Sequence, residues 1–250
     1  MAQREALSQV RISVRNLVEF VMRSGDLDDR RMAGAKKEAM QAGSRLHRKI
    51  QRRMGSDYQA EVSLKHTVKE DSFELLIEGR ADGIITEPGG VTIDEIKCIY
   101  MDPGRLEEPD PVHMAQALCY GTIYAVHHDL EEIGIQLTYC NIETEEIRRF
   151  KEVKTREELE DWFKGLIHEY VKWARYLYHH RMRRQECLKT LQFPYAYREG
   201  QKELAACVYR SVAEGRNLYI QAPTGVGKTL STVFPSLKAM GEGYGEKLFY

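Results

Sequence analysis

The stretches Gly79-Arg80-Ala81-Asp82-Gly83 and Asp94-Glu95-Ile96-Lys97 decide the fold of this chain. Both read as β-strands, and the turn-forming residues Glu87-Pro88-Gly89-Gly90 lie between them. The sequence therefore predicts a hairpin whose loop is formed by these four residues. The register of that hairpin places Asp82 directly opposite Glu95, with Cβ atoms about 5 Å apart.

Two facing carboxylates destabilise a sheet unless a cation lies between them. Carboxylate oxygens are ligands that Mg²⁺ and Mn²⁺ prefer, and such an ion polarises a phosphoryl oxygen and lowers the pKa of bound water. Lys97 shares a strand face with Glu95, where its ammonium group could orient water and stabilise charge on a phosphate. The hairpin predicts a metal site for phosphodiester hydrolysis, although an ordinary charged surface hairpin would show the same pattern.

Helices around the hairpin carry further polar side chains suited to this site. The apolar spacing predicts helices near residues 12–22, 35–54, 112–127 and 156–188, and strands near 60–64, 73–77, 91–99, 135–139 and 147–153. His47 lies in the second helix, where a neutral imidazole could complete the metal site. Gln116 and Tyr120 are four residues apart in the third helix and share one face. Any one of these residues alone would be an ordinary polar side chain.

This order of motifs resembles the RecB-like branch of the PD-(D/E)xK nucleases over residues 11–184. The matching motifs are G…H, G-x-x-D, E-x-K and Q-x-x-x-Y, at Gly43 and His47, Gly79 to Asp82, Glu95 to Lys97, and Gln116 to Tyr120. Ala81 stands where the family name has proline. The resemblance implies a restriction-endonuclease-like α/β core, a central mixed sheet flanked by helices, in a nuclease domain of residues 1–190.

The same resemblance implies the roles of the site residues. His47, Asp82 and Glu95 would bind Mg²⁺ or Mn²⁺. Asp82, Glu95 and Lys97 would carry out catalysis. Gln116 and Tyr120 would help to hold DNA. Some relatives bind an iron–sulfur cluster through four cysteines, but the cysteines of this chain are placed differently, and no cluster is expected in this segment.

A second motif follows a predicted strand at 217–221 and precedes a predicted helix; it reads Ala222-Pro223-Thr224-Gly225-Val226-Gly227-Lys228-Thr229. In such glycine-rich loops backbone N–H groups surround phosphates, and the N-terminus of the next helix favours negative charge. Lys228 would contact the β- and γ-phosphates of ATP, and Thr229 would bind its Mg²⁺. Ala222 replaces the usual first glycine of this loop.

The loop resembles motif I of superfamily 2 helicases, and Tyr197 to Gln201 resembles the adenine-sensing segment of the XPD/DinG-like group, with Gln201 reading the base of ATP. This resemblance covers residues 193–250. It implies the truncated beginning of a RecA-like P-loop domain over residues 191–250. Neither the acidic residue nor the second lobe of such a motor follows Thr229, and the last residues, 247–250, read as a strand. We therefore expect a fragment that does not unwind DNA by itself.

Composition narrows the class of protein. The 250 residues are 42% hydrophobic with a net charge of −1, no apolar run approaches membrane-spanning length, and no signal peptide is evident. Basic residues are concentrated at 30–53 and 175–184, where local patches could bind phosphate backbones. Five scattered cysteines without a C-x-x-C pair argue against disulfides and a structural zinc site, and favour the reducing cytoplasm.

Three functions remain open from the sequence. In the leading hypothesis a helicase motor exposes single strands of DNA at the expense of ATP, and the N-terminal domain cuts them. In the second, the nuclease fold has lost its chemistry and only holds DNA for the motor. In the third, the phosphate loop belongs to another ATPase unrelated to nucleic acids. The oligomeric state, the cutting polarity and the choice between exo- and endonuclease action are not predicted.

Overall fold

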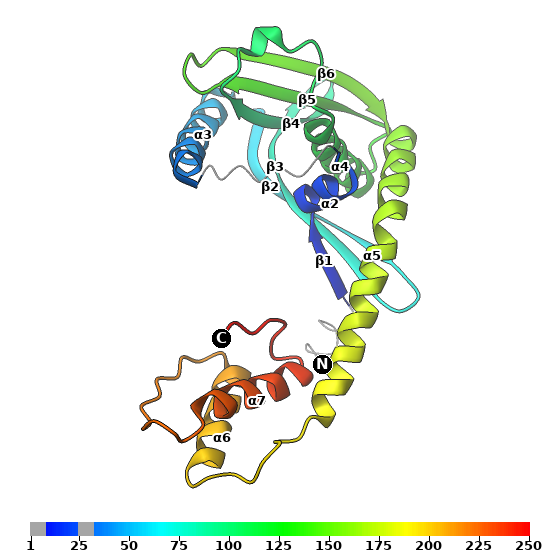
Figure 1. The fold of residues 1–250 in the computed structure, drawn as a ribbon. Helices are drawn as coiled ribbons and strands as arrows, with labels where there is room; N and C mark the ends of the chain where they lie inside the picture. The colour runs from blue at the N-terminus through cyan, green and yellow to red at the C-terminus, as the bar shows by residue number, and fades with distance from the viewer. Residues whose placement is uncertain (1–8, 25–32) are drawn as a thin grey trace. The chain divides into compact units, whose positions relative to one another are not determined.

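The computed structural model describes residues 9–24 and 33–250 of the chain (Figure 1). Residues 1–8 and 25–32 of the predicted nuclease domain, and the first three residues of the basic segment 30–53, lie outside the described residues. The chain divides into two compact units, Arg11–Lys172 and Trp173–Tyr250, the second with Gln9 and Val10. The domain boundary expected after residue 190 stays a prediction.

The described part of the larger unit is a six-stranded mixed sheet flanked by helices. Its elements in chain order are β1 (Gln9–Ser13), α2 (Val14–Val21), α3 (Ala33–Arg53), β2 (Tyr58–Lys69), β3 (Glu74–Glu87), β4 (Gly90–Ile99), the 3-10 turn η1 (Pro103–Arg105), α4 (Pro111–His128), β5 (Glu132–Asn141), β6 (Ile147–Thr155) and α5 (Arg156–Thr190). The mixed α/β sheet predicted from the sequence is confirmed.

The sheet has the strand order β1-β3-β4-β5-β6, and β2 pairs with β3. β4 and β5 are parallel, whereas the pairs β2–β3, β3–β4 and β5–β6 are antiparallel. Parallel neighbours need a crossover connection, and α4 supplies it between β4 and β5. The parallel pair lies inside the sheet, between β3 on one side and β6 on the other (Figure 1).

Helices cover both faces of the parallel pair. On one face, α4 approaches β5 so closely at Gly121 that a Cβ there would lie 2.4 Å from Ile135. On the other face, Leu46 and Ile50 of α3 form a buried cluster with Ile96 of β4 and Cys140 of β5. Burial on two faces agrees with the burial of every residue of β5 from Ile133 to Asn141, the polar Gln136 and Thr138 included.

The predicted helices at 35–54, 112–127 and 156–188 are confirmed as α3, α4 and α5, and all five predicted strands are present. The helix predicted at 12–22 begins later, because residues 12 and 13 belong to β1. Ser13 is the N-cap of α2, and its Oγ accepts a hydrogen bond from the Asn16 N–H at 3.2 Å. Asp110 caps α4 in the same way, with Pro111 at the first helical position.

The smaller unit contains the end of α5, α6 (Gln201–Glu214) and α7 (Lys228–Gly241). The strands predicted at 217–221 and 247–250 are wrong, since the structure has no strand over residues 173–250. A strand needs a partner for its backbone hydrogen bonds, and these segments have none here. A RecA-like sheet is therefore not observed. Within the described ranges, no helix combines the length and the apolar character needed to cross a membrane.

Candidate active site

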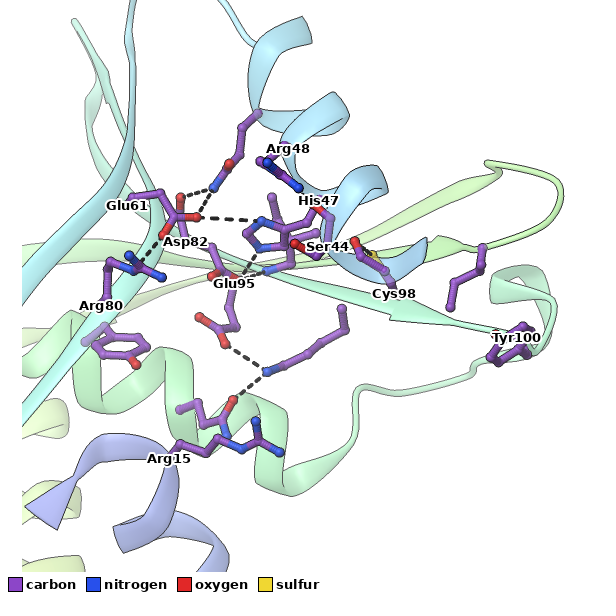
Figure 2. Close-up of a pocket in the computed structure, with 17 residues that line it drawn as sticks. Arg15, Ser44, His47, Arg48, Glu61, Arg80, Asp82, Glu95, Cys98 and Tyr100 are labelled. Atoms are coloured by element: carbon purple, nitrogen blue, oxygen red, sulfur yellow. Dashed lines mark hydrogen bonds and ion pairs between the residues drawn. The ribbon is translucent and has the colours of Figure 1, made fainter. Parts of the chain in front are cut away.

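A cleft of about 1200 Å³ lies where β3 and β4 separate (Figure 2). Six elements, α2, α3, β2, β3, β4 and α4, contribute side chains to it. Those with polar groups relevant to chemistry are His47, Gln51, Glu61, Arg80, Asp82, Glu95, Lys97, Gln116 and Tyr120. The cleft thus collects all six residues that the sequence singled out for the nuclease site.

The hairpin has the predicted register but a shorter turn. Glu87 pairs with Gly90, so only Pro88 and Gly89 remain in the loop, and the ladder continues to Gly83 and Asp94. It stops one pair before Asp82 and Glu95, so the direct cross-strand pairing expected for them is wrong. The reason is that the Asp82 carboxylate accepts a hydrogen bond from the Ile96 N–H at 2.7 Å, which holds the strands apart. Both carboxylates nevertheless line the cleft.

Glu95 is only 5% exposed. Its Oε1 accepts a hydrogen bond from Lys97 at 2.9 Å, whereas its buried Oε2 has no hydrogen-bond partner among the described residues. Burial, helped by the nearby charge of Asp82, raises the pKa of Glu95 to about 7. An ionised carboxylate is costly in such a place unless a cation compensates it. The donor set therefore fits a hard divalent ion.

Asp94, the neighbouring carboxylate, has the opposite character. It is fully buried, and it accepts hydrogen bonds from Thr138 at 2.6 Å, Gln136 at 2.9 Å and Tyr58 at 3.3 Å. Burial raises the pKa of Asp94, and the hydrogen bonds from Thr138 and Gln136 oppose that rise. Asp94 is thus satisfied by the protein itself, whereas Glu95 is not. This contrast separates a structural carboxylate from one suited to an external ligand.

His47 points from α3 toward Asp82, with Glu95 beside them (Figure 2). Its Nε2 lies 3.1 Å from Asp82 Oδ2, and this hydrogen bond raises the pKa of His47. His47, Asp82 and Glu61 each offer a ligand atom, and these atoms lie within 4.8 Å of one another. The fold brings His47, Asp82 and Glu95 to one cleft, and their role as metal ligands stays a prediction.

Lys97 is held between two acceptors. Its Nζ donates to Glu95 Oε1 at 2.9 Å and to Gln116 Oε1 at 2.5 Å. Gln116 is buried and comes from α4. Because an ammonium group has three N–H donors, one remains for a group in the cleft. Gln116 therefore orients the lysine, and its predicted contact with DNA stays a prediction.

Tyr120 is also buried at the cleft wall. A hydrogen bond from the backbone of Arg80 fixes its hydroxyl, and burial raises the pKa of Tyr120. Its ring covers Gly79, where an added Cβ would lie 2.8 Å from the hydroxyl oxygen. The structure thus shows Tyr120 supporting β3, and a contact with DNA stays a prediction here too.

Four charged residues of the cleft were missed by the sequence analysis: Glu61, Arg15, Arg48 and Arg80. Glu61 lies across from Asp82, between the paired residues Ala60 and Val62 of β2. The turn between β2 and β3 would have given this register by the same reasoning used for the first hairpin. The three arginines come from α2, α3 and β3, and only the tertiary fold gathers them around the carboxylates (Figure 2).

The predicted nucleotide loop of the smaller unit precedes α7, which begins at Lys228. Gly225 and Gly227 have φ angles of 84° and 77°, in the left-handed region that favours glycine. Gln201 is buried, and its Nε2 donates to the Val226 carbonyl at 3.3 Å. Lys228 folds back, and its Nζ donates to two loop carbonyls at 2.8 and 3.0 Å. The predicted adenine-reading residue and the phosphate loop therefore lie in contact.

Comparison with known proteins gives partial likenesses. No protein-family model matches the chain. A probable ATP-dependent helicase of Methanocaldococcus jannaschii is 47% identical over 47 residues, which are 18% of this chain and 7% of that protein. The chain thus spans a small part of the length of this curated relative.

Two solved structures also match part of the chain. The crystal structure of SSO0001 has a TM-score of 0.41 at 22% identity, covering 66% of this chain and 80% of that one. An alkaline exonuclease (LHK-Exo) from Laribacter hongkongensis has a TM-score of 0.37 at 14% identity, covering 71% of this chain and 96% of that one.

Proposed function

We propose that the unit formed by residues 11–172 is a metal-dependent DNA nuclease of the RecB-like PD-(D/E)xK type. The observation that supports this most directly is the buried, unpartnered Oε2 of Glu95 beside Asp82 in a cleft that also contains Lys97. His47, Asp82 and Glu95 would hold Mg²⁺ or Mn²⁺. When bound, such an ion supplies Lewis-acid polarisation of the phosphate and an activated water.

The side chains of the cleft have separate tasks in this reaction. Lys97, fixed by Glu95 and Gln116, keeps one N–H donor for a phosphate oxygen on which negative charge develops. Arg15, Arg48 and Arg80 line the same cleft and would bind the neighbouring phosphates of the strand. The backbone of the DNA would therefore lie across the fork between β3 and β4.

We further propose that residues 193–250 bind ATP and belong to a helicase motor that supplies single-stranded DNA to the nuclease. The contact between Gln201 and the loop, and the left-handed glycines of the loop, support this part of the proposal. On binding ATP, Lys228 would exchange its two loop carbonyls for phosphate oxygens. Thr229 would bind the Mg²⁺ of the nucleotide.

The nuclease proposal is tested with the whole chain and labelled single-stranded DNA. Wild type is expected to cut in the presence of Mn²⁺ and to stop when a chelator is added. Lys97→Ala is expected to abolish cutting while keeping Mn²⁺ binding and the circular dichroism spectrum, because Lys97 contacts the phosphate rather than the ion. Lys65→Ala, on the exposed part of β2, is the matched control and should cut like wild type.

Two outcomes would contradict the proposal. Cutting that survives in Lys97→Ala would exclude the assigned mechanism. Binding of DNA without any metal-dependent cutting by wild type would favour the alternative, a nuclease fold that only holds DNA for the motor.

A further inference from the structure

Glu61 has an unusual backbone in the middle of a strand. Its φ angle is 59°, and it interrupts the pairing between β2 and β3 that Ala60 and Val62 maintain on either side. Residues other than glycine seldom adopt this conformation, and where they do the surroundings hold them there, often at a functional site. The position lies across from Asp82 and lines the cleft.

Both carboxylate oxygens of Glu61 are already held by the protein. Arg80 Nε lies 2.6 Å from Oε2, and Gln51 Nε2 donates to Oε1 at 2.9 Å. The same Gln51 nitrogen also donates to the carbonyl of Asp82 at 2.9 Å. Glu61 therefore differs from Glu95, whose Oε2 lacks a partner. A carboxylate fixed on both sides is suited to orient a neighbour rather than to accept a new ion.

The neighbour of Glu61 is His47. Nε2 of His47 lies 3.1 Å from Asp82 Oδ2, on the side of the expected metal, while Nδ1 lies 3.8 Å from Glu61 Oε1 (Figure 2). A histidine that binds a metal through one ring nitrogen usually donates the other N–H to a carboxylate or carbonyl, which fixes its tautomer and ring orientation. The three residues have the order that this role requires, with His47 between Asp82 and Glu61, and the 3.8 Å between Nδ1 and Oε1 must shorten to become a hydrogen bond.

We propose that Glu61 is a positioning residue of the metal centre, which holds the His47 ring with its Nδ1–H toward β2 and its Nε2 toward the ion. This inference rests on the proposed function, because it assumes that His47 and Asp82 share a cation. Gln51 extends the arrangement by joining Glu61 to the backbone of Asp82. Arg80 completes it by neutralising Glu61, so the carboxylate adds no uncompensated charge.

The test is the affinity of the whole chain for Mn²⁺, measured by calorimetric titration without DNA. Glu61→Ala is expected to bind Mn²⁺ about 10- to 100-fold more weakly than wild type, the usual effect of losing such an orienting group. Glu61→Gln keeps an oxygen that accepts from the Nδ1–H, so its affinity should lie closer to wild type. Glutamate, glutamine and alanine all carry a Cβ and meet the same strain at this left-handed position, so backbone strain does not distinguish the variants.

Two further variants and one spectrum complete the experiment. Glu87→Gln, at the exposed hairpin turn, should bind like wild type, whereas Glu95→Ala should lose binding because a ligand is removed. Nitrogen-15 spectra of the Mg²⁺-loaded protein should show the proton of His47 on Nδ1 in wild type and in Glu61→Gln. In Glu61→Ala a mixture of tautomers is expected.

The possible contrary results are distinguishable. If Glu61→Gln bound Mn²⁺ as weakly as Glu61→Ala, Glu61 would be identified as a metal ligand and the positioning role would be overturned. If Glu61→Ala bound Mn²⁺ as tightly as Glu87→Gln while Glu95→Ala bound it more weakly, the inference would be overturned and the metal centre would stand. No Mn²⁺ binding by wild type would overturn the proposed metal centre and this inference together.

Discussion

Replacing Glu95 with glutamine should stabilise the protein when metal is absent. Glu95 is 5% exposed, and its pKa rises from the usual 4.5 to about 7. Because the folded pKa lies above the unfolded value, the stability that Glu95 contributes is present in full below pH 4.5 and is lost as the pH rises to about 7. At about 1.36 kcal/mol per pH unit, the loss amounts to about 3 kcal/mol. Glutamine keeps the shape of the side chain without the charge.

Urea denaturation of the whole chain in the presence of a chelator, at pH 5 and at pH 8, measures this change in the free energy of unfolding. The free energy of unfolding of Glu95→Gln minus that of wild type should increase by about 2–3 kcal/mol between the two pH values. Added Mn²⁺ should cancel most of the difference at pH 8, because it stabilises wild type by about 2.7 kcal/mol when its free concentration is about 100 times Kd. Glu95→Gln should gain much less from the metal.

The control for this experiment is Glu87→Gln, because Glu87 is exposed at the hairpin turn and should change neither the stability nor its pH dependence. If Glu95→Gln and wild type showed the same pH dependence in the chelator, the Glu95 carboxylate would not be destabilised by burial. The main physical reason for placing a cation at this site would then be refuted.

Two further substitutions test other parts of the structure. Gly83→Ala should lower the free energy of unfolding by about 1–3 kcal/mol, because the new Cβ would lie 1.9 Å from the Tyr58 hydroxyl and force it away from Asp94. The control is Gly89→Ala, whose Cβ would meet nothing within 4 Å. Thermal denaturation compares the two variants, and equal stability of Gly83→Ala and Gly89→Ala would contradict the prediction. Lys228→Ala should weaken ATP binding about 10-fold or more by removing a charged hydrogen-bond donor, and an unchanged affinity in a fluorescent-nucleotide titration would rule out the phosphate contact.

The central hairpin could be predicted because its information is local. A proline–glycine turn and two flanking strands are sufficient to set the register, and the observed pairing of Gly83 with Asp94 follows that register. The helices were found for the same reason, since their apolar spacing and their caps lie within short segments. What local patterns could not show is where the ladder stops, because that depends on the Asp82 carboxylate replacing a backbone partner.

Tertiary contacts decide the rest of the candidate site. Arg15 and Arg48 come from two different helices, α2 and α3, and no spacing rule connects them with a strand. The two strands predicted in the smaller unit failed for a related reason, since an apolar segment becomes a strand only when another strand accepts its hydrogen bonds. Glu61 is the exception, because the register of the β2–β3 turn would have placed it across from Asp82 from the sequence alone, although the sequence analysis missed it.

The glycines of β3 show how the motifs depend on one another in space. Gly79 leaves the room that the Tyr120 ring occupies, and Gly83 leaves the room for Tyr58. Any side chain at Gly79 would displace Tyr120, which lies one turn beyond the Gln116 that holds Lys97. The glycine of the G-x-x-D strand is therefore required by the tyrosine of the Q-x-x-x-Y helix. Two motifs that look independent in the sequence form one packed wall of the cleft.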